Sequence, residues 1–238
     1  MGKNLIQQRR GRGSPTFRAL HHRFLGKIEL RPLDEAERGA VPGKVTELRH
    51  SPSHSAPLAQ LVYATGERVL LPAPEGLVVG SAVAIGAAAE PKPGNVLPLS
   101  AIPIGAQIYN IEAVPGDGGR FVRAAGCTAK IIAKSEKAVT VRLPSKALRE
   151  FAPACRATIG TIAGSGRREK PMLKAGSAYW AARGRYWPVV KGQSMNAVSH
   201  PHGGKRSSKK NYPYTVSRHA PPGAKVGSIA ASRTGRKK

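Results

Sequence analysis

The sequence predicts a mainly β protein, with two small β-barrels in tandem and irregular basic extensions at both ends. Three observations predict this fold class. Short apolar or alternating runs are separated by turn signals, with no helical pattern between them. Residues 115–119, PGDGG, form a strong break near the middle of the chain. Basic residues gather towards the two ends, where large apolar residues are few.

Residues 1–36 are expected to form a basic N-terminal extension. Residues 1–31 hold eight Lys or Arg against one acid, and Phe17 and Phe24 lie among them. Arginine supplies a planar donor fork for phosphate, and aromatic rings can stack on bases. We therefore expect nucleic-acid binding rather than a solvated tail. The candidate contacts are Arg9, Arg10, Arg12, Arg18 and Arg23.

Residues 37–114 are expected to form the first β unit. Its strands are predicted at 45–48, 57–64, 68–72, 82–87 and 107–114. Pro-Gly, Thr-Gly and Pro-Glu-Gly signals separate them, at a spacing typical of a small all-β barrel or sandwich. The last run should close this unit before the break that follows it.

Residues 115–190 are expected to form the second β unit and a basic aromatic segment. Strands are predicted at 128–133, 138–143 and 156–163, and in the second of these Val139 and Val141 should share one face. Beyond residue 164 the chain places Tyr179, Trp180, Tyr186 and Trp187 among basic residues. This combination suits base stacking beside phosphate contacts, and anchoring in the second core is an equal alternative.

The formal net charge of +26 is unevenly distributed. Residues 32–166 hold fourteen bases and eleven acids, whereas the expected C-terminal extension, 191–238, holds eleven bases and no acid. Basic extensions beside a balanced body suit a polyanion, because each neutralised phosphate releases condensed counterions. Neither extension has a visible core, so residues 1–36 and 191–238 should be disordered until they meet a partner.

A membrane partner is disfavoured by the same composition. The basic segments are rich in Gly, Pro and Ser, and no apolar run is long enough to span a bilayer. The N-terminal sequence lacks a hydrophobic signal-peptide core, which predicts an intracellular protein. Cys127 and Cys155 form no CxxC motif, so we expect buried thiols rather than a zinc site or a disulfide.

Residues 192–204, GQSMNAVSHPHGG, form an uncharged loop between basic segments. Its proline and glycines shape the backbone around two imidazoles. Three interpretations are open: a catalytic histidine, a metal site, or a loop that fits closely against a nucleic-acid backbone. The residues that define it are His200, Pro201, His202, Gly203 and Gly204.

The first two interpretations are weaker on sequence grounds. Residues 191–238 contain no acid, so a hydrolase would need an orienting carboxylate from elsewhere in the chain. Two histidines without a nearby third ligand make a poor zinc site, and no metal is expected. The glycines at 164–166 match neither the P-loop nor the dinucleotide-binding spacing.

Several stretches, in order along the whole chain, resemble one protein family. They are QRRGRGSPTFRA at 8–19, PGNVLPLSAIPIGAQIYNIE at 93–112, PGDGGRFVRAAG at 115–126, CRATIGTIAGSGRREKPMLKAG at 155–176, GQSMNAVSHPHGG at 192–204 and APPGAKVGSIAASRTGR at 220–236. The chain is similar to the second protein of the large ribosomal subunit (the universal L-two family) in its archaeal and eukaryotic form. The resemblance implies an OB-fold barrel, then an SH3-like barrel, with basic extensions penetrating ribosomal RNA.

The resemblance also implies a function without catalysis. It implies a structural constituent that binds large-subunit rRNA near the peptidyl-transferase region and supports subunit association, tRNA placement and peptide-bond formation. Expected partners are neighbouring large-subunit proteins and the small subunit, through an intersubunit bridge; rRNA-associated Mg²⁺ is the one ion expected. The expected location is the cytoplasmic ribosome.

Two other classes compete with this expectation. One is a nucleic-acid-modifying or hydrolytic enzyme that uses His200, and the other is a DNA-compacting protein. Folded RNA offers crevices for irregular basic arms, which favours RNA over DNA.

Individual positions follow from the matched stretches. His200 matches a family histidine suspected of a part in peptide-bond formation, and Arg123 matches an RNA-binding arginine. Ser199 stands where Asp is common, so nothing in the local sequence orients the imidazole and packing against RNA is favoured. His54 replaces a frequent arginine, and Lys205 a third glycine. The expected RNA-binding set is Arg9, Arg10, Arg12, Arg18, Arg23, His54, Arg123, Arg156, Arg167, Arg168, Lys174, Arg183, Arg185, Met195, Asn196, His200, His202, Gly203, Gly204, Lys205, Arg206, Arg218, Arg233 and Arg236.

Overall fold

A computed structural model of the chain describes residues 2–10, 12–17, 22, 24–33, 39–182, 186–204 and 214–232, except for the side chain of Arg168. Tertiary contacts divide the chain into two units. His21–Pro171 is called the sheet unit below, and Met1–Leu20 together with Met172–Lys238 is called the terminal unit.

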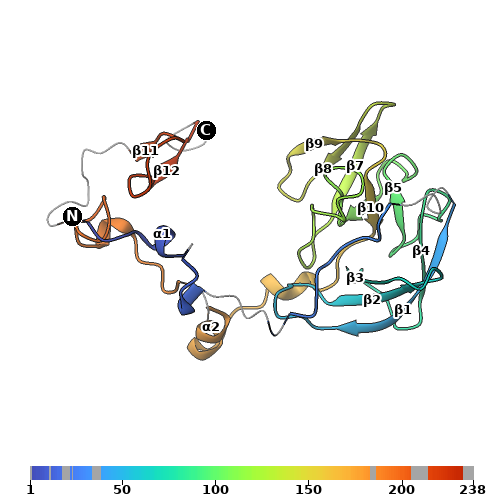
Figure 1. The fold of residues 1–238 in the computed structure, drawn as a ribbon, viewed down its shortest axis with the longest axis horizontal. Helices are drawn as coiled ribbons and strands as arrows, with labels where there is room; N and C mark the ends of the chain where they lie inside the picture. The colour runs from blue at the N-terminus through green and yellow to red at the C-terminus, as the bar shows by residue number, and fades with distance from the viewer. Residues whose placement is uncertain are drawn as a thin grey trace. The chain divides into compact units, whose positions relative to one another are not determined.

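Ten strands of the sheet unit join in the order β3-β2-β1-β4-β5-β10-β6-β7-β8-β9 (Figure 1). Neighbours run antiparallel, except where β4 meets β5 in parallel through Ile85 and Val96. The edges are β3 and β9, and no pairing between described strands joins them. The prediction of a mainly β fold is confirmed. The strands are β1 Val41–Arg49, β2 Leu58–Tyr63, β3 Arg68–Pro72, β4 Ala82–Ile85, β5 Val96–Pro98, β6 Gln107–Tyr109, β7 Ala129–Lys134, β8 Val139–Arg142, β9 Leu148–Phe151 and β10 Arg156–Ile159.

Two hydrophobic cores lie along this sheet. Strands β1 to β4 enclose the first, in which Val45, Leu58 and Ile85 are fully buried. The strands from β5 onward enclose the second, which includes Ile108 and Ile131. A small third cluster around Tyr109 and Ile162 connects the halves, because the Tyr109 hydroxyl donates a hydrogen bond to the Pro72 carbonyl at 3.2 Å.

The strand predictions hold best where apolar residues alternate. β3 has the predicted bounds, and in β8 Val139 and Val141 are both buried, as expected for residues that share one face, while Arg142 is exposed. The strands β5 and β9 were not predicted. The first is three residues long, and three of the four residues of the second are exposed, so neither carries an alternating pattern.

The predicted strand at 107–114 ends early. Only Gln107–Tyr109 is extended, since Asn110 adopts a φ of 49°, in the left-handed region. This short strand, β6, pairs with β10 and β7, so it lies in the second core instead of closing the first.

Part of the expected N-terminal extension is folded into the sheet unit. Ile28 and Leu30 are buried in the first core, and the Leu30 amide donates to the Gly118 carbonyl at 3.0 Å. The Arg31 side chain is 1% exposed, with its Nε 2.6 Å from Glu67 Oε2. This burial corrects the expectation that the whole of 1–36 is disordered without a partner.

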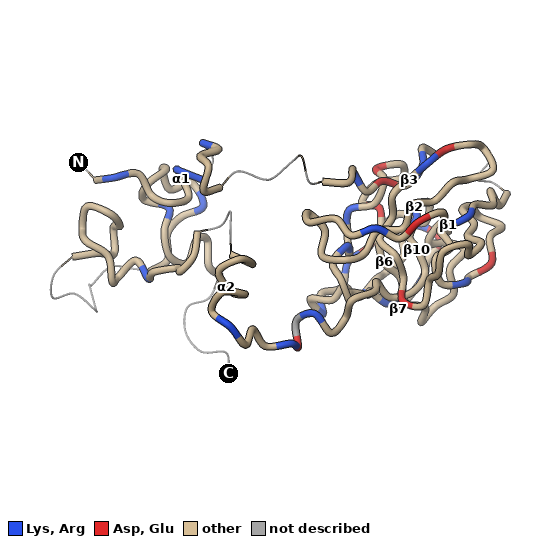
Figure 2. Tube along the Cα trace, turned by 90° about the horizontal axis from the view of Figure 1, so that it is seen from below, with Lys and Arg blue, Asp and Glu red and all other residues tan. Residues whose placement is uncertain are grey.

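The terminal unit contains short elements that the sequence analysis did not predict. Its buried apolar side chains, among the described residues, are Leu5 and Val226. The unit carries nineteen Lys or Arg and no Asp or Glu, whereas all thirteen acids belong to the sheet unit. Figure 2 shows this segregation for the described residues, with Asp and Glu in red. The elements are α1 Ile6–Arg10, η1 Pro15–Phe17, α2 Ala175–Ala182, η5 Gly192–Ser194 and the parallel pair β11 Thr215–Val216 and β12 Ser228–Ile229.

Candidate nucleic-acid interface

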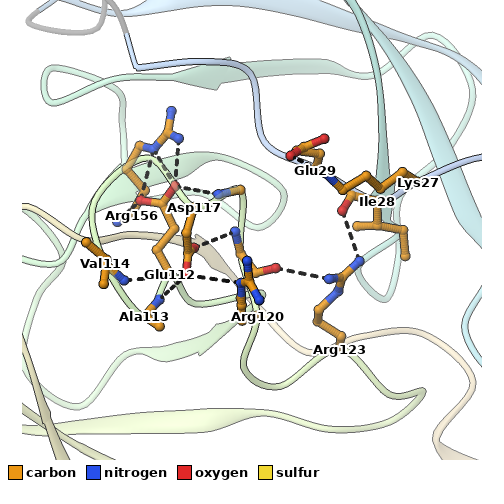
Figure 3. A network of polar contacts seen from close by, with 12 residues as sticks. Lys27, Ile28, Glu29, Glu112, Ala113, Val114, Asp117, Arg120, Arg123 and Arg156 are labelled. Atoms are coloured by element: carbon orange, nitrogen blue, oxygen red, sulfur yellow. Dashed lines mark hydrogen bonds and ion pairs between the residues drawn. The ribbon is translucent and has the colours of Figure 1, made fainter.

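A buried ion pair at the start of β10 removes one expected RNA contact from the surface. The Nη2 of Arg156 lies 2.6 Å from Glu112 Oε1, and the two side chains are 2% and 0% exposed (Figure 3). The Arg156 amide also donates to Glu112 Oε2 at 2.9 Å, and its Nη1 donates to the Arg31 carbonyl at 3.0 Å. We therefore correct the expectation that Arg156 binds RNA, because its guanidinium is buried in an ion pair with Glu112.

Arg123 is fixed at the edge of the same network (Figure 3). Its Nη1 donates to the Gly119 carbonyl and its Nη2 to the Ile28 carbonyl, each at 3.0 Å. Asp117 shapes the loop that presents Gly119, because its Oδ1 accepts the Gly119 amide at 3.1 Å. The half-buried guanidinium is thus held in one orientation, which suits directed contact with a phosphate.

Three expected contacts that are distant in sequence come together here. Partial burial first, and the positive charge of Arg123 second, lower the pKa of His54 below its ordinary value. Arg167 Nη1 donates to the Ser55 carbonyl at 3.4 Å, and the Ser55 hydroxyl accepts the Ala125 amide at 3.0 Å. His54, Arg123 and Arg167 therefore define one surface of the sheet unit, called the arginine surface below.

In the terminal unit, the imidazole of His200 is held by backbone. Its Nδ1 accepts a hydrogen bond from the His202 amide at 3.0 Å, so the neutral ring carries its proton on Nε2. A Cβ at Gly192 would overlap the ring, which is therefore closely packed against that glycine. The expectation that nothing local orients this imidazole is corrected: an amide does so where a carboxylate was looked for.

The electrostatic setting of His200 disfavours acid–base chemistry. Burial first, and the neighbouring His202 second, lower its pKa below the ordinary value. The His202 ring lies 5.0 Å from His200 and 5.1 Å from Tyr214, in edge-on contacts. No Asp or Glu belongs to the terminal unit, so within it no carboxylate side chain can stabilise an imidazolium.

The glycines of the loop are required by its own backbone. A Cβ at Gly203 would overlap the carbonyls of Met195 and Asn196. The Gly204 amide donates to Met195 O at 3.1 Å, and the His200 amide donates to Asn196 O at 3.2 Å. Residues 195–204 therefore close on themselves and present a fixed surface.

The aromatic residues of the basic segment are mostly exposed. Tyr179 and Trp180 on α2 are 57% and 63% exposed, with ring centroids 5.6 Å apart, and Trp187 is 51% exposed. Tyr186 is half-buried. None of the four belongs to the hydrophobic cores, so the alternative of core anchoring is not supported among the described residues.

Of the other expected contacts, Met195 is half-buried and the rest are either exposed or undescribed. The exposed ones are Arg9, Arg10, Arg12, Arg167, Lys174, Asn196 and Arg218. The residues Arg18, Arg23, Arg183, Arg185, Lys205, Arg206, Arg233 and Arg236, with the side chain of Arg168, lie outside the described part of the chain.

Sequence reasoning missed some residues of these surfaces. Gly192 and Tyr214 pack against the two histidines, and Arg149 lies 4.4 Å over the ring of Phe121. Gly192 is the first residue of the matched loop GQSMNAVSHPHGG, and this glycine was the one sequence signal that could have indicated close packing there. The ring contacts join residues distant along the chain, which no local pattern indicates.

The described residues contain neither a metal-binding cluster nor a membrane-spanning helix. In the described ranges, no three or more His, Cys, Asp or Glu side chains gather as a metal ion would require. Within the same ranges, no helix has the length and apolar character needed to cross a membrane.

These features define a nucleic-acid-binding protein. It combines a folded β body with arginines held by backbone carbonyls, exposed aromatic residues and a unit without acids. Comparison with known families specifies it further. The description "Ribosomal Proteins L2, RNA binding N-terminal domain" matches residues 3–85, and "Ribosomal Proteins L2, C-terminal domain" matches residues 92–224.

Full-length relatives agree with the two family matches. Large ribosomal subunit protein uL2 of Methanothermobacter thermautotrophicus is 52% identical over 100% of both chains. That of Methanopyrus kandleri is 52% identical over 99% of this chain and 98% of its own, and that of Methanocaldococcus jannaschii is 50% identical over 100% of both. The chain belongs to the uL2 family of ribosomal proteins. It is an RNA-binding structural constituent of the large ribosomal subunit rather than an enzyme.

Proposed function

We propose that the chain holds large-subunit rRNA through the arginine surface of its sheet unit and through its terminal unit. The single observation that carries this proposal is the charge of the terminal unit, nineteen bases without an acid. A unit of that composition with two buried apolar side chains among its described residues gains most of its stability by neutralising phosphates. The arginine surface adds guanidinium groups in fixed orientations.

The finer architecture is part of the proposal. We propose an OB-fold barrel over residues 37–114 and an SH3-like barrel over 115–190, between extensions at 1–36 and 191–238. The two hydrophobic cores along the ten-stranded sheet support two β domains. The family matches to residues 3–85 and 92–224 also support two parts, although their boundary, like the start of the second core, lies earlier than residue 114.

The proposed place in the subunit is near the peptidyl-transferase region. There the chain would contact neighbouring large-subunit proteins and, through a bridge, the small subunit, and would support subunit association and tRNA placement. The loop at 192–204 would support peptide-bond formation by positioning RNA. The backbone bond to His200 Nδ1 supports a positioning role, because that bond must break if Nδ1 is to accept a proton.

Sedimentation of cell extract tests the proposal. The chain should travel with large subunits and remain there in moderate salt. A second sample lacking residues 205–238 should dissociate at lower salt, because ten Lys or Arg are then lost. Recovery of the intact chain apart from large subunits at low salt would contradict the proposal.

A further inference from the structure

A pocket in the terminal unit lies where three segments of the chain converge. Its volume is about 290 Å³. Apolar surface comes from Leu5 of the N-terminal segment, Val198 and Pro201 of the histidine loop, and Pro222 of the C-terminal segment. The Lys3 amide donates to the Val198 carbonyl at 2.8 Å, which ties the first two segments together. The volume is near the lower end of the range for ligand pockets, about 300–1,000 Å³, so it suits one small planar group.

The polar side chains that line the pocket are those of Lys3, Asn4, Gln8 and His200. Gln8 lines it, and its Oε1 is already occupied, because it accepts the Leu5 amide at 2.8 Å at the start of α1. The Gln8 Nε2 therefore has two hydrogens left to donate. His200 also lines the pocket, and with Nδ1 occupied by the His202 amide its remaining group is the Nε2–H donor.

The charge of the pocket argues for a base rather than a phosphate. Among the described residues that line it, Lys3 is the one Lys or Arg and none is acidic. A phosphate group is usually held by several cations or amide donors, whereas a base needs apolar faces and a few directed hydrogen bonds. Two proline rings and the neutral side chains of Asn4, Gln8 and His200 suit the second requirement.

We propose that this pocket receives one unstacked base of the rRNA, a guanine whose N7 and O6 accept hydrogen bonds from Gln8 and His200. Guanine presents these two acceptors side by side, whereas adenine presents a donor beside its N7. Unstacked bases are the usual targets of sequence-specific RNA recognition. The inference rests on the proposed function, since it names the RNA element that the terminal unit binds.

The test compares two adjacent glutamines in the full-length chain. Gln8→Glu keeps an oxygen for the Leu5 amide but removes both donors from the pocket. Gln7→Glu is the matched control, because it makes the same charge change at an exposed residue that does not line the pocket. Dimethyl sulfate, which methylates guanine N7, is applied to large-subunit rRNA bound to each protein.

One guanine N7 should be protected by the natural chain and by Gln7→Glu, and methylated with Gln8→Glu. Relative to Gln7→Glu, Gln8→Glu should bind the rRNA about tenfold more weakly, with the same salt dependence, because phosphate contacts are unchanged. Ala197→Phe, which fills the pocket, should uncover the same guanine, whereas Ala181→Phe on α2 should not.

Identical footprints for both glutamine variants and for both alanine variants would overturn the inference, as would protection of a base other than guanine. In that case the proposed function stands as long as the natural chain binds rRNA with steep salt dependence. Failure of the natural chain to bind rRNA at all would instead overturn the proposed function, and this inference with it.

Discussion

At the scale of single residues, backbone groups hold the charged and titratable side chains of the candidate interface. Arg123 donates to two carbonyls, and His200 accepts one amide. Backbone partners move little, so each side chain is presented in one orientation before RNA arrives. Such preorganisation lowers the entropy that binding must overcome.

The first concerns His200→Gln. Glutamine keeps a donor and an acceptor, so the bond from the His202 amide can be kept and peptidyl transfer should proceed at an unchanged rate. A general base would instead lose on the order of 10²–10⁴ in rate. Gly203→Val should be worse for assembly, since a Cβ there overlaps two carbonyls. Peptidyl transfer is measured on subunits reconstituted with each variant, under conditions in which the chemical step limits the rate. If subunits with His200→Gln assemble normally but lose most of this rate, His200 is catalytic.

The second concerns pH. The folded pKa of His200 is lowered, whereas an unfolded imidazole titrates near about 6.5. The unfolded chain therefore binds more protons in the window between these two values, so the loop is fully stable above that window and loses stability as pH falls through it. The protection factor of the His202 amide, followed by hydrogen exchange, should fall in this window. Unchanged protection down to pH 5 would contradict the assignment.

The third concerns Glu112→Gln. The substitution leaves the buried Arg156 charge without its carboxylate, which should cost about 3–5 kcal/mol of folding stability. Urea denaturation of the full chain measures the loss. Glu90→Gln is the control, because Glu90 pairs with Lys92 in the open and such exposed pairs contribute little. Equal stability of the two variants would mean that the buried pair is not needed.

At the scale of elements, residues 24–33 act as an additional segment of the sheet unit. Ile28 and Leu30 fill the first core, and the carbonyls of Ile28 and Arg31 receive the guanidinium groups of Arg123 and Arg156. This segment thus orders one member of the arginine surface. Its basic residues, Lys27 and Arg31, lie in the range 1–36 that the sequence analysis assigned to a basic extension.

This docking predicts a break in hydrogen exchange within the N-terminal 36 residues. In the unbound chain, the Leu30 amide should be protected because it donates to Gly118. Residues 2–17 should exchange within seconds to minutes, since Leu5 is their one buried apolar side chain. Exchange of Leu30 as fast as that of residues 2–17 would show that the segment does not dock without RNA.

At the scale of the whole molecule, the two units differ in how they are stabilised. The sheet unit has two cores and all thirteen acids, which offset most of its twenty Lys or Arg and leave a net charge of +7. The terminal unit has neither, and its net charge of +19 makes RNA its natural counterion. The family to which the chain belongs is consistent with this division of roles.

The corresponding prediction is a steep salt dependence of rRNA binding. The log–log slope should be roughly −0.7 to −0.9 for each phosphate contacted, and it should flatten when residues 205–238 are removed. Filter binding over a series of salt concentrations measures both slopes. An affinity nearly independent of salt would refute the electrostatic account of the terminal unit.

The sequence by itself determined the β class, the segregation of charge and the family. These properties are carried by local alternation, as in Val139 and Val141, by composition, and by ordered motifs. Tertiary structure alone decided that Arg156 is buried and that Ser55, beside His54, contacts Arg167 and Ala125. The physical reason is that β10 inserts between β5 and β6. Long-range pairing sets which charges are buried and which distant residues meet, and no local pattern contains it.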